Sequence, residues 1–293
     1  MIASLTGTLF SLATGVALAA YYTFNKLVTR AGSPLQIIFW IFAAHIPALA
    51  VWGALKYPLA FTWEYFLPGM VVLGLTVSGN LLAIRALSLS PFSLMMPVMC
   101  LSPVFTSLIG IVLLGEWPSA TQWAGIILAV VGVLWLYAPP ERPWDIFSFW
   151  AGFIRERGAI SMALSALSWS LSAPFDKLSL RHADPPFHAL FVFCGLVIFL
   201  FIWLTFNKEW ETAPIKREFW GIMALTGVAG ASADILQLLA LQHMPAGPFE
   251  AIKRVVSQVL ALALGYLLFH ESLSKARMVG VGIICIGVPM IVL

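Results

Sequence analysis

Charged side chains that could hold a solute gather in the stretch FEAIKRVVSQ, residues 249–258. On a helix, Glu250 lies three and four residues before Lys253 and Arg254, so that the three side chains can approach one another. Such a cluster suits an internal salt-bridge network whose long side chains reach toward water, a clamp for a carboxylate or phosphate, or a carboxyl group that takes up a proton. The residue types alone leave these three chemistries open.

Polar residues also interrupt other apolar parts of the chain. Asp234 lies deep within an apolar segment, where a charge costs about 2.5 kcal/mol or more and indicates a function, and its candidate partners are the charged residues of 249–258. Along 14–25 and 165–176, polar and aromatic residues at intervals of three or four share one helix face. These faces suit the wall of a cavity or hydrogen bonds between helices. The candidate solute-binding residues are Tyr21, Asn25, Ser78, Asn80, Arg85, Trp169, Asp176, Asp234, Gln237, Glu250, Lys253, Arg254 and Gln258.

The elements that must position these residues are long apolar segments. Of the 293 residues, 61% are hydrophobic and 10% are charged, whereas soluble domains carry about 25% charged residues. Since a helix crosses the hydrocarbon of a bilayer in about 20 apolar residues, we predict an all-α, multi-pass integral membrane protein. The ten predicted transmembrane helices are 4–26, 34–55, 65–87, 91–114, 120–138, 158–180, 186–206, 217–241, 247–269 and 275–293.

Several function classes leave no signal in the sequence. The net charge of +3 is small and the basic residues are scattered, so no nucleic-acid partner is expected. The three cysteines and five histidines are dispersed, which favours neither a metal site nor disulfides. We expect no cofactor and no enzyme, although an intramembrane enzyme and a membrane scaffold stay as rival hypotheses. The first apolar segment lacks a preceding basic region and is expected to be retained as a span.

The two halves of the chain are copies of each other. At an offset of 155 residues, five residues recur unchanged: Gly110, Glu116, Ser119, Gly125 and Gly132 match Gly265, Glu271, Ser274, Gly280 and Gly287. At an offset of 151, Asn25 and Lys26 fall on Asp176 and Lys177. At an offset of 154, Asn80 falls on Asp234, so that candidate residues of the two halves occupy matching positions.

Each copy holds five predicted spans, and this odd number has a geometric consequence. The second copy must enter the membrane from the opposite face, so the two halves are inverted. Inverted repeats are typical of alternating-access transporters, whose solute site lies near the membrane midplane. We therefore expect repeats at 1–138 and 158–293 around a central cavity, joined by a linker at 139–157. The WDIFSFWAGFI part of this linker is too short to cross and suits the membrane interface.

The junction VLLGEWPS, residues 112–119, occurs again as LLFHESLS, residues 267–274. In each copy a glutamate, Glu116 or Glu271, ends one span and precedes the next. A glutamate near a helix start can accept hydrogen bonds from free backbone amides and suits the positive end of the helix dipole. We therefore predict that each glutamate caps a helix at the membrane edge.

These pieces resemble the drug/metabolite transporter superfamily, in particular its EamA type. The resemblance is carried by SPVFTSLIGIVLLGEWPSATQWAGIILAVVGVLWL, by its copy SQVLALALGYLLFHESLSKARMVGVGIICIGVPMIVL, and by the NK…R…SP run with its second-half counterpart DK…R…DP. It implies a ten-helix fold whose cavity is lined mainly by the first, third, fourth, sixth, eighth and ninth spans. It also implies a secondary transporter of small metabolites, often an exporter of amino acids, in a bacterial inner membrane.

The resemblance does not determine the solute, because one fold can serve many functions. Lys253 and Arg254 favour an anionic metabolite instead of an amino acid, and Gln258 stands where the family usually has proline. The expected partners are a small-molecule solute, the lipid bilayer and coupling protons. An excess of Lys and Arg marks the cytoplasmic side, and the loop residues favour both termini outside. The resemblance implies that both termini are cytoplasmic, so the orientation stays open.

Overall fold

The computed structural model describes residues 4–28, 31–56, 59–89, 102–136, 157–211, 215–269 and 275–292. In this part of the chain the α-helices are α1 (Leu5–Val28), α2 (Pro34–Lys56), α3 (Phe66–Leu89), α5 (Ser102–Leu114), α6 (Ala120–Leu136), α8 (Ala159–Ser179), α9 (Pro185–Phe206), α10 (Trp220–His243), α11 (Ala246–Phe269) and α12 (Lys275–Val292). Short 3-10 helices cover Trp63–Tyr65, Glu209–Glu211 and Arg217–Phe219. The predicted all-α class is confirmed.

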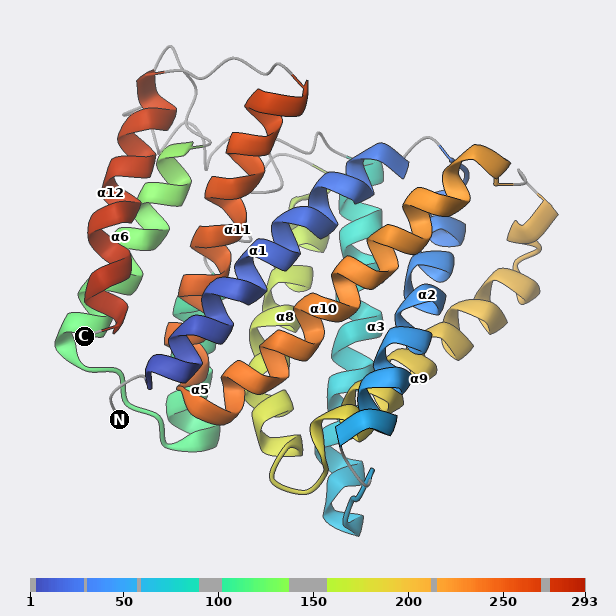
Figure 1. The fold of residues 1–293 in the computed structure, drawn as a ribbon, viewed down its shortest axis with the longest axis horizontal. Coiled ribbons are helices and arrows are strands. Elements are labelled where there is room, and N and C mark those ends of the chain that lie inside the picture. Colours follow the sequence, from blue (N-terminus) through green and yellow to red (C-terminus); the bar gives the residue numbers. More distant parts are fainter. Residues whose placement is uncertain are drawn as a thin grey trace.

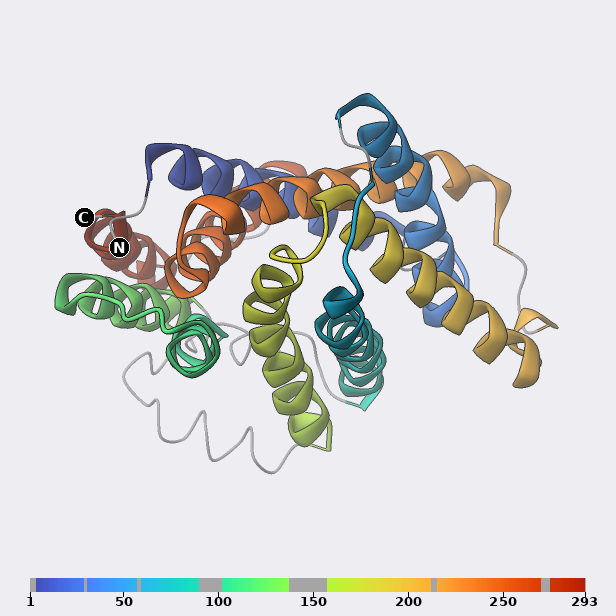
Figure 2. The ribbon, with the colours of Figure 1, turned by 90° about the horizontal axis from the view of Figure 1, so that it is seen from below.

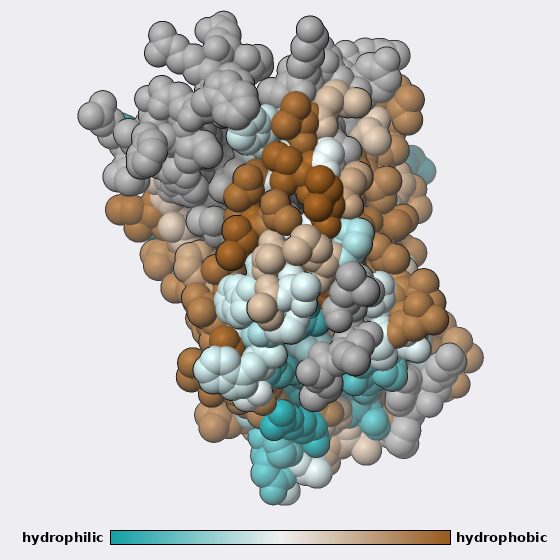
Figure 3. Space-filling model, turned by 90° about the vertical axis from the view of Figure 1, so that its left-hand side faces the viewer, coloured by the Kyte–Doolittle hydropathy of each residue, from teal (hydrophilic) through white to brown (hydrophobic). Residues whose placement is uncertain are grey.

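Each predicted span has a helix at its place in the chain. The fourth, predicted at 91–114, is described only from Ser102 onward, and the WDIFSFWAGFI segment lies outside the described residues. Among the described residues, five helices are long and apolar enough to cross a membrane; they belong to α1, α2, α3, α9 and α10. Apolar side chains cover much of the surface, and hydrophilic ones gather toward the lower end of the view (Figure 3).

Eight of the described helices pack in a closed ring, and their arrangement can be followed in Figures 1 and 2. Following neighbours that pack against each other, the ring runs α1, α10, α2, α9, α3, α8, α5, α11 and back to α1. Helices α6 and α12 pack against each other beside α11, outside the ring (Figure 1). The ring therefore encloses an interior to which helices from both ends of the sequence contribute.

The packing repeats between the first five helices and the last five. In chain order, the helices of the first copy are α1, α2, α3, α5 and α6, and their counterparts in the second copy are α8, α9, α10, α11 and α12. With this pairing, the contact of α1 with α10 matches the contact of α8 with α3. In the same way, the contact of α1 with α11 matches that of α8 with α5. The pairs α2 with α9, α5 with α11 and α6 with α12 join a helix to its own counterpart. This exchange of partners is what a twofold relation between the two copies requires.

The α6–α12 pair depends on a close approach between glycines. A Cβ atom added at Gly125 would lie 2.7 Å from the carbonyl oxygen of Gly287 and 2.9 Å from the backbone nitrogen of Ile291. These are backbone atoms, so they cannot move aside as a flexible side chain could. In α12 itself, a Cβ at Gly282 would meet nothing within 4 Å.

We predict that Gly125→Ala lowers the midpoint of thermal denaturation in detergent, because the added methyl group separates α6 from α12. The matched substitution Gly282→Ala should leave the midpoint unchanged or raise it, since alanine favours a helix over glycine by about 1 kcal/mol. Equal midpoints for the two variants would contradict the close approach as a source of stability.

Candidate functional site

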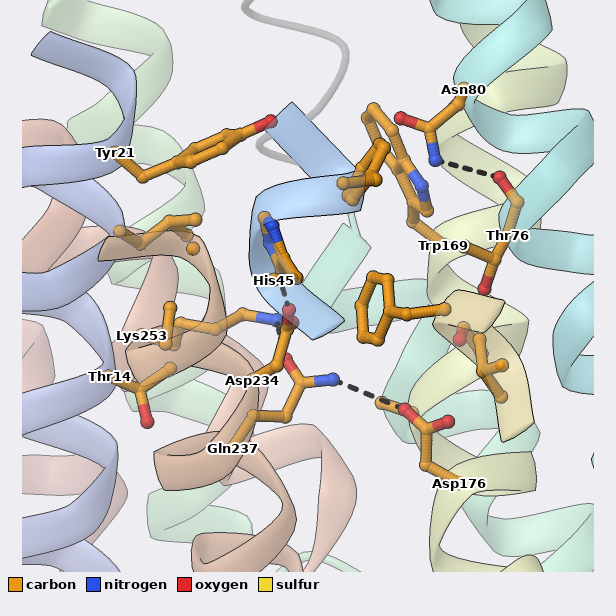
Figure 4. Close-up of a pocket in the computed structure, with 18 of the residues that line it drawn as sticks. Thr14, Tyr21, His45, Thr76, Asn80, Trp169, Asp176, Asp234, Gln237 and Lys253 are labelled. Carbon is orange, nitrogen blue, oxygen red and sulfur yellow. Dashed lines mark hydrogen bonds and ion pairs between the residues drawn. The ribbon is translucent and has the colours of Figure 1, made fainter. Parts of the chain in front are cut away.

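A cavity of about 420 Å³ lies within the ring. Its lining comes from α1, α2, α3, α8, α9, α10 and α11. The resemblance implied that the fourth span lines the cavity and that the second and seventh spans contribute little. Instead, the second and seventh spans, α2 and α9, line the cavity, and the described part of the fourth span contributes no lining residue. Figure 4 shows Tyr21 and Trp169 on opposite sides of this space, with His45 and Asp234 between them.

Most of the predicted site residues come together in this cavity. Those that line it are Tyr21, Asn25, Asn80, Trp169, Asp176, Asp234, Gln237, Glu250, Lys253, Arg254 and Gln258. Ser78 is not in the lining, and its hydroxyl group donates to the carbonyl oxygen of Leu75 at 3.2 Å. Arg85 is exposed near the C-terminal end of α3 and is also not in the lining.

The matched polar faces of α1 and α8 serve both predicted roles, the wall of a cavity and hydrogen bonds between helices. Thr14, Leu18, Tyr21 and Asn25 line the cavity, as do Trp169, Ser172 and Asp176. Ser165 instead donates a hydrogen bond to the carbonyl oxygen of Gly79 on α3 at 2.7 Å. This face of α8 therefore both joins the helix to α3 through Ser165 and lines the cavity.

Glu250 organises the charged cluster of α11. One carboxylate oxygen accepts hydrogen bonds from Arg254 Nη2 at 2.8 Å and Ser102 Oγ at 3.0 Å, and the other is 2.5 Å from Lys253 Nζ. Glu250, Lys253 and Arg254 are all buried, so the cluster does not reach out to water. Of the chemistries open to this stretch, the geometry matches an internal salt-bridge network, and it forms part of the cavity wall.

Gln237 extends this cluster across the ring. Its side-chain oxygen accepts a hydrogen bond from Lys253 Nζ at 3.0 Å, and its nitrogen donates to Asp176 Oδ2 at 3.2 Å. The other carboxylate oxygen of Asp176 is 3.0 Å from His188 Nε2. One chain of polar contacts thus joins α11, α10, α8 and α9 along the cavity.

His188 has a partner for each ring nitrogen without an added proton. Its Nε2 faces a carboxylate and must donate, which leaves Nδ1 to accept the hydroxyl proton of Tyr65 at 2.9 Å. The position of His188 follows from the start of α9, where Asp184 is extended and Pro185 and Pro186 fix the first turn. Both His188 and Tyr65 are buried.

Asp234 has a partner that the sequence analysis did not predict. Its Oδ2 is 3.5 Å from His45 Nε2 on α2, whereas Lys253 bonds to Glu250 and Gln237. The approach of His45 requires Gly230, one turn before Asp234 on α10, because a Cβ there would lie 2.4 Å from Nε2. The candidate partners on α11 are thus replaced by a histidine of α2.

Comparison with known proteins identifies the family. The model of the EamA-like transporter family matches residues 5–138 and 156–293, which together make up nearly the whole chain. The chain belongs to the EamA-like transporter family. The family is one of transporters, and the long apolar helices indicate an integral membrane protein with several spans.

Two further similarities support the fold and the class of this EamA-like transporter. The chain is 23% identical over 193 residues to "Uncharacterized transporter YoaV" of Bacillus subtilis (strain 168), a match that covers 64% of this chain and 62% of that protein. A solved structure described as "Crystal structure of protein" superposes with a TM-score of 0.81, at 16% identity over 98% of both chains. At this identity the second likeness shows the fold alone.

Glu116 of this EamA-like transporter caps a helix, but not the one that follows it. Its Oε2 accepts the backbone N–H of Ala246 at the start of α11, 2.9 Å away, and its Oε1 forms an ion pair with Lys177. Lys177 also donates to the carbonyl oxygen of Met244 at 2.8 Å. The predicted cap is therefore a contact between the two halves. Its counterpart, Glu271, lies outside the described residues.

Sequence reasoning missed His45, His188 and Tyr65. No spacing pattern marks them, since each partner lies on a different element of the fold. One signal was present for the histidines: each is a polar residue inside an apolar span, as Asp234 is. That signal indicates a buried role but cannot name the partner.

We predict that Tyr65→Phe lowers the free energy of unfolding in detergent by about 1–2 kcal/mol, because it leaves the buried Nδ1 of His188 without a donor. In a His188→Leu background, the same substitution should cost much less. Thermal or denaturant unfolding of the four proteins gives the coupling energy directly. A coupling near zero would show that the hydroxyl group of Tyr65 does not serve His188.

Proposed function

We propose that this EamA-like transporter exports a small zwitterionic metabolite, an amino acid or a close relative, across a bacterial inner membrane. The observation that carries the proposal is the mixed charge of the central cavity. Its volume of about 420 Å³ is within the range of about 300–1,000 Å³ usual for small-molecule sites. A zwitterion needs an acidic group for its ammonium, polar groups for its carboxylate and a wall for its side chain.

The charges that line the cavity support a zwitterion over an anion. The lining includes three carboxylates, Asp176, Asp234 and Glu250, and two basic side chains, Lys253 and Arg254. Both basic side chains already bond to Glu250, whose single negative charge offsets one of their two positive charges, and Asp176 and Asp234 add two more negative charges to the lining. An anionic metabolite held by Lys253 and Arg254 would have to compete with Glu250, which disfavours that second candidate function.

Aromatic residues supply the apolar wall that such a solute needs. Tyr21 from α1 and Trp169 from α8 face the cavity from opposite sides (Figure 4). Because they belong to different halves of the chain, a solute between them would contact both. Polar and aromatic groups that converge on one space from inverted halves are what a carrier site near the midplane requires.

Transport by alternating access would require each end of the ring to close in turn. The Glu116 and Lys177 contacts join the end of α8 to the loop before α6 and to the start of α11. At the same end, Ser4 Oγ donates to the carbonyl oxygen of His243 at 3.0 Å. These contacts support a state in which the end that bears Met244 is closed.

We predict that purified protein in proteoliposomes exchanges radiolabelled amino acids, and that glycerol 3-phosphate and malate do not exchange. Counterflow with a panel of L-threonine, L-phenylalanine, glycine betaine and the two anions measures this. Exchange of the anions alone, together with a weaker apparent affinity in Lys253→Gln, would overturn the zwitterion proposal. Exchange of none of these solutes in either direction would also count against it.

A matched pair of tryptophans tests the cavity itself. Trp169→Ala should raise the half-saturation concentration about tenfold, since an aromatic contact and its buried area are worth about 1.4 kcal/mol. Trp203→Ala, on the exposed side of α9, should leave that concentration unchanged. Equal effects of the two substitutions would place the solute outside the cavity.

We predict that Glu116→Gln opens the end of the ring that bears Met244. In a background free of native cysteines, Met244→Cys should be labelled by a water-soluble maleimide about fivefold faster with Glu116→Gln, because a partly buried ion pair is worth about 1 kcal/mol. Met244 is only 1% exposed in the closed arrangement. Glu64→Gln, an exposed glutamate, is the control and should not change the rate. An unchanged rate in Glu116→Gln would contradict closure by this pair.

A further inference from the structure

The two histidine–aspartate pairs of the cavity differ in whether a neutral imidazole can form a hydrogen bond with the aspartate. In the Asp176–His188 pair, a neutral imidazole donates from Nε2 and accepts from Tyr65 at Nδ1, and every contact is satisfied. In the Asp234–His45 pair, the atom that faces the backbone is Nδ1, which is 2.8 Å from the carbonyl oxygen of Ile41. A carbonyl oxygen can only accept, so Nδ1 of His45 carries a hydrogen.

The fixed tautomer of His45 determines what its other nitrogen can do. In a neutral imidazole with a hydrogen on Nδ1, Nε2 carries a lone pair. This lone pair faces the carboxylate of Asp234 at 3.5 Å, an arrangement of two acceptors. The contact becomes favourable when one proton is added, either to form an imidazolium or to convert Asp234 to a carboxylic acid that donates to Nε2. Both arrangements hold the same single extra proton.

We propose that the His45–Asp234 pair is a proton-binding site, and that the ammonium group of the solute takes the place of this proton at Asp234. This rests on the proposed function for the identity of the solute, but the proton site itself does not. When the solute enters, its ammonium group forms an ion pair with the Asp234 carboxylate, the proton leaves to water, and His45 returns to the neutral form. At Asp234 one positive charge replaces another, while the carboxylate of the solute enters with it, so the cavity that holds the zwitterion carries one net positive charge less than the cavity that holds the proton.

The surroundings of the pair suit a proton that can be exchanged. His45 is 1% exposed and lies among the rings of Phe42 and Phe193, at centroid distances of 4.9 and 5.2 Å, which disfavours a lasting imidazolium without its counter-ion. The side chain of Asp234 is 28% exposed and lines the cavity, so both the solute and water can reach it. The distance of 3.5 Å is longer than an N–H···O hydrogen bond, so the two groups share no hydrogen in this arrangement.

The other acidic and basic groups that face the cavity are already engaged. The titratable groups on neighbouring helices are Tyr21 and Tyr22 on α1, Asp176 on α8, His188 on α9, and Glu250, Lys253 and Arg254 on α11. Asp176 bonds to His188 and Gln237, and Glu250 bonds to Lys253 and Arg254. Among the described residues, Asp234 has His45 as its charged partner within 4 Å. The exchange of solute for a proton is therefore assigned to this carboxylate.

Such an exchange links transport to a proton gradient. Since the proton and the ammonium group compete for one carboxylate, the two move in opposite directions across the membrane. Proton entry would then drive solute exit, in agreement with export. The cost is that solute binding weakens at low pH, where the proton occupies Asp234.

The first test needs no solute. Difference titration of purified protein between about pH 5 and pH 9 counts the protons that wild type binds in excess of Asp234→Asn. We expect about one extra proton in wild type. His45→Gln, whose amide donates to the carboxylate without binding a proton, should lose it as well. Glu64→Gln, at an exposed glutamate outside the cavity, is the control and should keep it. Equal proton counts in wild type and in correctly folded Asp234→Asn and His45→Gln would overturn the proton site.

The second test measures exchange. L-Threonine, or another panel amino acid that shows counterflow, is added to protein in weakly buffered detergent with a pH indicator. About one proton should be released per amino acid bound in wild type and in Asp234→Glu, and none in Asp234→Asn. Counterflow without proton release would overturn the exchange while the proposed function stands. Absence of counterflow would instead count against the proposed solute, and the solute-free titration would still decide the proton site.

Discussion

The buried charges of α11 have to be compensated by other side chains, because burial removes most of the water that would stabilise them. Glu250 contacts Lys253 and Arg254 at once, since each of its carboxylate oxygens faces one basic group, and its single negative charge offsets one of their two positive charges. Gln237 then connects Lys253 to Asp176 through one neutral amide that donates at one end and accepts at the other. The compensation leaves a cavity that is polar and of mixed sign rather than strongly basic, and this is why it suits a solute that carries both charges.

Duplication supplied the scaffold, and divergence supplied the charges. The contacts between helices repeat when the two copies are exchanged, so the ring is a property of both. Its chemistry is not shared in this way: Asn25 corresponds to Asp176, and Asn80 corresponds to Asp234. In the first copy these positions keep neutral amides, while the second copy carries carboxylates. The acid groups of the cavity therefore come from one copy, although the walls come from both.

Hydropathy and length were sufficient to predict the helices, because a bilayer requires long apolar segments whose backbone groups are satisfied internally. The α11 cluster was also predictable, since its members are neighbours on one helix. The partner of Asp234 was not, because His45 lies on another helix and reaches α10 only where Gly230 leaves room. Glu116 shows the same limit: its capping chemistry was predictable from residue type, but its acceptance of the Ala246 N–H depends on the arrangement of two halves. Local patterns determine which groups are buried, and ring closure determines which of them meet.

The C-terminal turn of α8 joins the cavity to the end of the ring through two consecutive residues. Asp176 bonds to His188 and Gln237 in the cavity, and Lys177 bonds to Glu116 and Met244 where the two halves meet. A shift of this turn therefore alters both sets of contacts together. A solute that enters between Trp169 and Asp234 lies beside the same helix, since Trp169 belongs to α8. The physical connection from a solute in the cavity to the contacts at the end of the ring would thus be one helix, α8, in which Pro174 lies between Trp169 and Asp176.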